Sequence, residues 1–295
     1  MTATHPAPTG GCATEVTTAP AVRGLVTSRR SRLLCLALGL VTLAGAVPTI
    51  VDDGLLRGPA AMNGSARGTA LVMAAVAVPL LAVGARAVGR GQARGWPLVL
   101  GAAGYLLYNA VLLVFGTPFN HAFLAYVAIL SLSGWTIGSL LSEVDVEAFA
   151  ARLRPTLPVR PIAGYVWVVV GLNALLWLKA AVPASLADGT PHLLDGTGLT
   201  TMPTYVQDLA GWLPLMGVAA WWLWRRAARG YLLTGAGMVM WVVESIGVAT
   251  DQYWGHLADP ASTVVAPAMI PVFGLLAVIG IVPVVAVLRR LPAGR

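Results

Sequence analysis

The sequence predicts an all-α protein, a polytopic transmembrane helix bundle with eight spans. Two features of its composition predict this class: 57% of the 295 residues are hydrophobic and only 11% are charged. Soluble domains carry ~25% charged residues, so this chain has too little polar surface for a soluble globule. Its apolar residues also form continuous runs, whereas a transmembrane β-barrel would show alternation.

Eight apolar runs are long enough to cross a membrane, which takes about 20 residues in a helix. In chain order they are Leu33–Val51, Thr69–Val88, Pro97–Gly116, His121–Leu141, Pro161–Val182, Thr204–Trp224, Tyr231–Trp254 and Val264–Leu288. Residues 1–32 have no apolar period and predict a disordered cytoplasmic tail. Ser28-Arg29-Arg30 before the first run also fits a cleaved signal peptide, an alternative to a retained span.

Basic residues lie at the ends of these runs and alternate between the two sides of the membrane. Those on the side of the N-terminus are Arg23, Arg29, Arg30, Arg32, Arg86, Arg90, Arg94, Arg152, Arg154, Arg160, Arg225, Arg226, Arg229, Arg289, Arg290 and Arg295. The other side holds only Arg57 and Arg67, and Lys179 falls within a span. Because basic residues favour the cytoplasmic side, both termini are predicted to be cytoplasmic. The net charge of +7 therefore indicates topology and not a nucleic-acid partner.

The chain resembles itself at an offset of 135 residues. The matched pairs include Pro48 and Pro183, Asp53 and Asp188, Pro79 and Pro214, Arg90 and Arg225, and His121 and His256. We therefore predict two four-helix halves, residues 33–160 and 161–295. Because four is an even number of spans, both halves enter the membrane in the same direction, as in transporters built from parallel repeats.

Ionisable residues within a span are costly in lipid, ~2.5–3.5 kcal/mol each, and are therefore candidate site residues. Glu244 follows Tyr231 by 13 residues, which places it ~20 Å along its helix, near the middle of the membrane. It is predicted either to bind a ligand or ion, or to be a structural, protonated carboxyl group. Its counterpart at the offset of 135 is Asn109, and Asn109, Tyr108 and Asp208 are the candidate hydrogen-bond partners on other helices.

Four further residues complete the predicted ligand- or ion-binding set. Asp208 and Lys179 lie about one turn inside the outer surface on successive spans and are predicted to form an ion pair. Alone, Asp208 would suit a helix N-terminus and Lys179 would extend to the interface. Tyr105 and Tyr108 share a helix face with Asn109, where they either line the site or make ordinary interhelical hydrogen bonds.

Other motifs are structural or missing. Gly134-x-x-x-Gly138 predicts close packing of two helices, and the charged residues in 143–154 predict a short surface helix. Nucleotide-binding loops, His-Glu-x-x-His, Gly-x-Ser-x-Gly and zinc-type Cys/His clusters do not occur in the sequence. No cofactor or metal site is therefore predicted, and no enzyme class is indicated.

Several short segments resemble a group of bacterial proteins. They include Tyr108-Asn109, Phe115-Gly116, Gln207-Asp208-Leu209, Leu223-Trp224-Arg225-Arg226 and Gly230-Tyr231-Leu232-Leu233. In these the chain resembles uncharacterised multi-pass membrane proteins of high-G+C Gram-positive bacteria, over about half its length. The resemblance implies a bacterial cell membrane as the location, but it brings no activity and no functional residues.

Two functions remain open from the sequence. The first is a transporter or permease for a small solute or ion, in which Glu244 binds a cation or proton. The second is a sensory, regulatory or assembly protein of the membrane that transports nothing. The lipid bilayer is the expected partner in both, with a small solute or proton added in the first.

Overall fold

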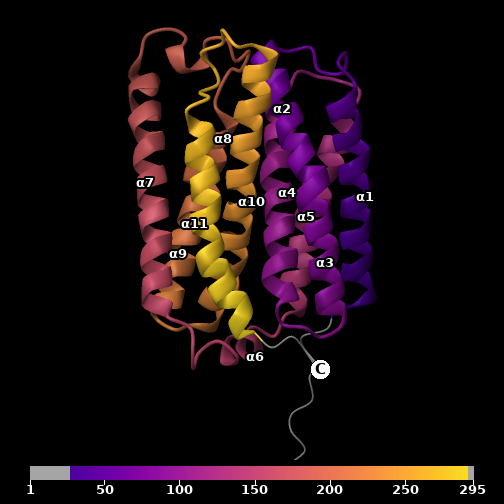
Figure 1. Ribbon diagram of the computed structural model, residues 1–295, viewed down its shortest axis with the longest axis vertical. Coiled ribbons are helices and arrows are strands. Elements are labelled where there is room, and N and C mark those ends of the chain that lie inside the picture. The colour runs from indigo at the N-terminus through magenta and orange to yellow at the C-terminus, as the bar shows by residue number, and fades with distance from the viewer. Residues whose placement is uncertain (1–26, 292–295) are drawn as a thin grey trace, which may run out of the picture.

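A computed structural model describes residues 27–291, which are helical with short connections (Figure 1). The long elements are α1 (Arg29–Val51), α2 (Ala60–Val72), α3 (Val78–Gly89), α4 (Gly95–Gly116), α5 (Phe123–Glu143), α7 (Val159–Leu186), α9 (Leu213–Trp224), α10 (Ala228–Ala258) and α11 (Met269–Arg290). The short ones are η1 (Met73–Ala77), α6 (Val146–Ala151), η2 (His192–Leu194), α8 (Pro203–Gln207) and η3 (Asp208–Trp212). Seven helical stretches within 27–291 are long and apolar enough to cross a membrane, with α2, η1 and α3 counted as one. The protein is thus a multi-pass membrane protein, as its composition predicts.

Every predicted apolar run coincides with a helical stretch, although several boundaries differ. The second stretch starts at Ala60, well before the predicted Thr69, because packing against α10 extends the helix through the small residues that precede the apolar run. Of the predicted tail, residues 1–26 lie outside the described residues, and Arg29–Arg32 form the first turn of α1. The sixth run, Thr204–Trp224, is helical as α8, η3 and α9 and is not among the seven long apolar stretches.

The helices stand side by side, with α7 at one edge of Figure 1 and α1 at the other. One end of the bundle carries most of the arginines, and we call it the arginine-rich end. Its basic residues are Arg29, Arg30, Arg32, Arg86, Arg90, Arg94, Arg152, Arg154, Arg160, Arg225, Arg226, Arg229, Arg289 and Arg290. The short helix α6 lies at this end, capped by Asp145, whose side chain accepts from the backbone N–H of Ala148. It confirms the predicted charged surface helix.

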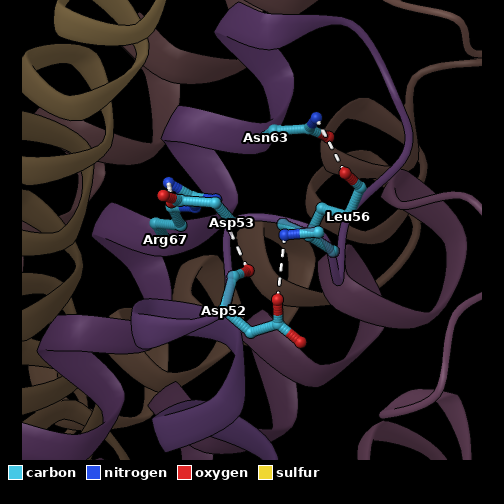
Figure 2. Close-up of polar contacts among 6 residues, drawn as sticks. Asp52, Asp53, Leu56, Asn63 and Arg67 are labelled. Carbon is cyan, nitrogen blue, oxygen red and sulfur yellow. Dashed lines mark hydrogen bonds and ion pairs between the residues drawn. The ribbon is translucent and has the colours of Figure 1, made fainter.

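At the opposite end, the loop between α1 and α2 is fastened by two side chains of α2 (Figure 2). The Nδ2 of Asn63 donates to the carbonyl oxygen of Leu56 at 3.2 Å. Arg67 forms an ion pair with Asp53, and its Nη2 donates to the carbonyl oxygen of Asp52 at 3.5 Å. This end therefore has its own polar network, and Arg67 is neutralised there by an acidic neighbour.

The closest helix contact involving α2 is with α10 and depends on glycines. A Cβ at Gly64 would collide with the carbonyl oxygen of Trp254, and one at Gly68 would lie 2.7 Å from the carbonyl oxygen of Thr250. Gly64 and Gly68 are thus a Gly-x-x-x-Gly motif that lets two backbones touch. The predicted close packing through Gly134 and Gly138 is not seen: both are exposed, and nothing lies within 4 Å of a Cβ at either.

The centre of the bundle is the contact between α4 and α10. A Cβ at Gly101 of α4 would lie 2.7 Å from the carbonyl oxygen of Ala236 of α10, so the two backbones touch toward the arginine-rich end. Tyr105, one turn further along α4, is fully buried. The two helices run in the same direction, and this central pair positions the polar residues described next.

Candidate functional site

Glu244 lies in the middle of α10 and faces α4. The Nδ2 of Asn109 donates to the Oε2 of Glu244 at 2.8 Å, and it also lies 3.2 Å from the carbonyl oxygen of Tyr105. The predicted contact between Glu244 and Asn109 is therefore present. Asn109 is buried, and Glu244 is the 17th of the 31 residues of α10, so the pair lies halfway along the bundle.

A buried hydroxyl lies beside this pair without a partner. Tyr105 is 0% exposed, and its hydroxyl makes no hydrogen bond within the described residues. A Cβ at Gly247, one turn after Glu244, would lie only 2.9 Å from that hydroxyl. Because an unsatisfied buried hydroxyl costs ~1–3 kcal/mol, this donor is available to a bound ion, water or solute.

Asp208 lies on η3, and its hydrogen-bond partner is not the predicted Lys179. Its Oδ2 accepts from the indole Nε1 of Trp177 at 2.8 Å, and its carboxylate neighbours the hydroxyl of Tyr108. Lys179 is exposed and makes no ion pair within the described residues, so the predicted Lys179–Asp208 pair is wrong. Trp177 lies two residues earlier on α7 and faces Asp208, whereas Lys179 is turned away from the protein.

Asp208 is also the first residue of a π-helical segment. The η3 segment precedes Pro214, and the η1 segment precedes Pro79 in the same way. Proline removes one backbone donor and clashes with the preceding turn, so a wider turn relieves the helix. Such π segments occur often at functional sites, and here one of them carries a buried carboxylate.

A cavity of about 400 Å³ opens at the end of the bundle opposite the arginines. The polar residues of its wall include Ser65, Thr69, Asp195, Thr204, Asp251 and Gln252. Asp251 follows Glu244 by seven residues, about two turns of α10 toward this end. No lysine or arginine is among the described residues that line it, and its ionisable residues are Asp251, Asp195 and His192, the last two of which pair with each other.

Gln252 orients Asp251 and closes one side of the cavity. Its Nε2 donates to the Oδ1 of Asp251 at 2.9 Å, and its Oε1 accepts from the backbone N–H of Ala266 at 2.7 Å. From the other side, the hydroxyl of Ser65 donates to the carbonyl oxygen of Asp251 at 3.2 Å. The helix α2 thus contacts the backbone of Asp251 directly, and the loop before α11 is linked to its side chain through Gln252.

Five of the six predicted site residues lie together in the region between α4, α10 and η3: Glu244, Asn109, Tyr105, Tyr108 and Asp208. Lys179 does not join them.

The residues that sequence reasoning missed include Trp177, Ser65 and Gln252, which only the fold brings to their partners. The spacing of Gly64 and Gly68 was the available signal, since it predicts that α2 approaches another helix closely there.

The chemistry of this region is that of carboxylates without cationic partners. Glu244 and Asp208 each accept from one neutral nitrogen, and no arginine or lysine of the described residues pairs with either. Buried carboxylates need a proton or a cation in compensation. Within 27–291, no group of three His, Cys, Asp or Glu side chains is arranged to hold a metal ion.

Comparison of the chain with known protein families, with curated proteins and with solved structures found no match.

Proposed function

We propose that this protein is a transporter or permease of the cytoplasmic membrane for a small solute or ion, with Glu244 as its central binding group. The observation that carries the proposal is the hydrogen bond from Asn109 to Glu244 in mid-bundle, beside the unpartnered hydroxyl of Tyr105. A carboxylate so deep in a membrane, without a basic partner, is suited to a proton or a cation. Asp251 and the cavity would give it an entrance.

The topology that we propose has eight spans. Both α7 and α10 begin at the arginine-rich end and run to the opposite end, so the chain between them has to return across the bundle. Pro203–Trp224 is the helical stretch that makes this return, packed beside α7 and α10. The arginine-rich end would face the cytoplasm, with both termini on that side.

We also propose that the two halves, 33–160 and 161–295, are parallel repeats. The local geometry supports this, because η1 and η3 have five residues each and start 135 residues apart. Beyond the helices that follow, Gly91 has φ +72° and Arg226 has φ +56°, again at an offset of 135. Arg226 is the one non-glycine residue with positive φ in the described chain, so a shared backbone shape is its simplest explanation.

The central helix pair supports the repeat as well. Gly101 approaches Ala236, and Asn109 bonds Glu244, and each pair joins positions that are 135 residues apart. In two parallel helices related by a twofold axis along the membrane normal, equivalent positions meet at the same depth. Transporters with repeats bind their substrates near the midplane at such an interface.

Reconstitution into liposomes tests the proposed function. Purified protein would be placed in vesicles that contain a pH-sensitive or sodium-sensitive dye, and a potassium diffusion potential would drive protons or Na⁺ inward. We expect flux above that of protein-free vesicles, loss of flux in Glu244→Gln, and normal flux in Glu147→Gln, which changes an exposed carboxylate of α6. Equal flux of the wild type and Glu244→Gln would overturn the role of Glu244.

One observation favours the second function, a sensory, regulatory or assembly protein. Between Glu244 and the arginine-rich end, α4 and α10 touch backbone to backbone at Gly101, so the polar site is closed on that side. A transporter would have to open this contact during its cycle. Absence of flux for both ions and for small solutes would favour the non-transporting alternative.

A further inference from the structure

A second cavity lies on the outside of the bundle, between α1 and α3. It is a groove of about 460 Å³ that opens near the arginine-rich end. Leu36 and Leu40 of α1 form one wall, and Val78 and Leu81 of α3 form the other. Gly39 lies between Leu36 and Leu40 in the wall formed by α1 and leaves the groove open at its middle, since a Cβ there would have only the Cγ1 of Val78 as a neighbour, at 3.7 Å.

Three arginines line the groove at the end where it opens. Arg32, Arg86 and Arg90 all line it, all are exposed, and none forms an ion pair with a described residue. The groove has no acidic lining residue. Glu143 of the neighbouring α5 is already bound, since its Oε1 accepts from the hydroxyl of Ser31 at 2.7 Å. The result is an apolar groove with three uncompensated guanidinium groups at its mouth.

The corresponding place in the second half of the chain is filled by the protein itself. At an offset of 135, the positions of Arg32, Arg86 and Gly89 in the first half correspond to Trp167, Trp221 and Trp224 in the second half. The ring centroids of Trp221 and Trp224 lie 6.5 and 5.3 Å from that of Trp167.

The indole Nε1 of Trp167 donates to the carbonyl oxygen of Gly217 at 3.2 Å, which ties α7 to α9 across the gap. Gly217 stands at the position of Ala82, a residue that lines the open groove. The open groove between α1 and α3 is therefore a property of its own residues and not a necessary consequence of the helix arrangement.

We propose that this groove binds one anionic phospholipid, with an acyl chain between α1 and α3 and its phosphate on Arg32, Arg86 and Arg90. Guanidinium groups bind phosphate oxygens in pairs, and basic pockets between transmembrane helices bind anionic headgroups on the cytoplasmic side. The assignment to the cytoplasmic leaflet rests on the proposed topology. The binding itself depends neither on transport nor on Glu244.

Native mass spectrometry of the purified full-length protein tests the proposal. The probes are dioleoyl phosphatidylglycerol, which is anionic, and dioleoyl phosphatidylcholine, which has the same chains and no net charge. We expect one phosphatidylglycerol to be retained per protein, at least about tenfold more tightly than phosphatidylcholine. Each of the single variants Arg32→Gln, Arg86→Gln and Arg90→Gln should weaken the binding of phosphatidylglycerol about fivefold, which is the effect of one basic residue near a charged membrane surface.

Matched variants separate this site from a general effect of charge. Arg225→Gln, Arg229→Gln and Arg289→Gln together remove as much charge from the same end of the bundle, away from the groove, and should leave lipid retention unchanged. Gly39→Phe keeps every arginine but fills the groove, and it should abolish retention. The arginine variants change only exposed side chains, so they decide the question if Gly39→Phe does not fold.

Three results would overturn the proposal: equal retention of the two lipids, an equal loss in the control set, or full retention of phosphatidylglycerol in Gly39→Phe. The last would mean that the arginines attract headgroups without any bound chain.

Discussion

Asn109 and Glu244 are hydrogen-bonded at 2.8 Å although they lie 135 residues apart, on two helices that run side by side in the middle of the bundle. The bond joins an amide donor to a carboxylate acceptor in a setting where water is scarce. The contribution of this bond to the stability of the protein can be measured.

Removal of the Glu244 carboxylate should cost stability only when the shape of the side chain is lost. Glu244→Gln keeps an acceptor for Asn109 and should unfold within about 1 kcal/mol of the wild type. Glu244→Leu removes the interhelical acceptor of Asn109, whose amide keeps only the carbonyl oxygen of Tyr105, and should cost about 1–3 kcal/mol. Adding Asn109→Leu should recover part of that loss, because both polar groups are then gone. Unfolding in mixed micelles compares the wild type, the two Glu244 variants, Asn109→Leu alone and the double-leucine variant, and additive effects of the two leucines would contradict the bond.

The glycines of α2 should be far more sensitive than those of α5. Gly68→Val places a branched side chain against the backbone of α10 and should cost at least about 1–3 kcal/mol, the usual range for overpacking. Gly134→Val is the matched control, since nothing lies within 4 Å of its Cβ. Thermal unfolding in detergent compares the two. A larger loss in Gly134→Val would mean that α5 contacts a further molecule, such as a second copy of the chain.

Asp208 should depend on Trp177 and not on Lys179. Trp177→Phe removes the 2.8 Å hydrogen bond to the buried carboxylate and should cost about 1.5–3 kcal/mol, as for bonds to charged groups. Lys179→Ala changes an exposed side chain without an ion pair and should stay within about 0.5 kcal/mol of the wild type. An equally large loss of unfolding free energy in Lys179→Ala would contradict this and support the Lys179–Asp208 ion pair that the sequence predicted.

The proposed orientation can be read from reporter fusions. Fusions after Arg94, Arg160 and Arg229 should be active in the cytoplasm, and fusions near Gly54 and Gly196 should be active outside. A fusion near Gly64 is unsuitable because this residue packs against α10. One reproducible reversal would contradict either the eight-span topology or its direction.

Hydropathy predicts the helices because each transmembrane segment has to meet the requirements of the membrane by itself. Every span has to be apolar and has to satisfy its own backbone, and both requirements are written locally in the sequence. The same local reasoning failed at the start of α2, where Asn63 and Gly64 precede the apolar run. Gly64 meets α10 there, a contact that hydropathy does not register.

The candidate site was predictable to the extent that a buried charge is conspicuous. Glu244 stands out in an apolar helix, and Asn109, at the offset of 135, was one of its three candidate partners. The depth of a residue along its span does not indicate which way the side chain turns on its helix. Lys179 therefore seemed paired with Asp208, whereas rotation of α7 presents Trp177 to the carboxylate.

The sequence by itself determined the class of the protein, the helices and the residue most costly to bury, because these follow from transfer energies of single segments and side chains. Only the tertiary structure decided which glycines touch a neighbour, which end holds the cavity beside Asp251, and that the groove between α1 and α3 stays open. Those features depend on how each helix is rotated about its own axis. That rotation is set by the packing of all its neighbours together, since lipid and protein interior are almost equally apolar.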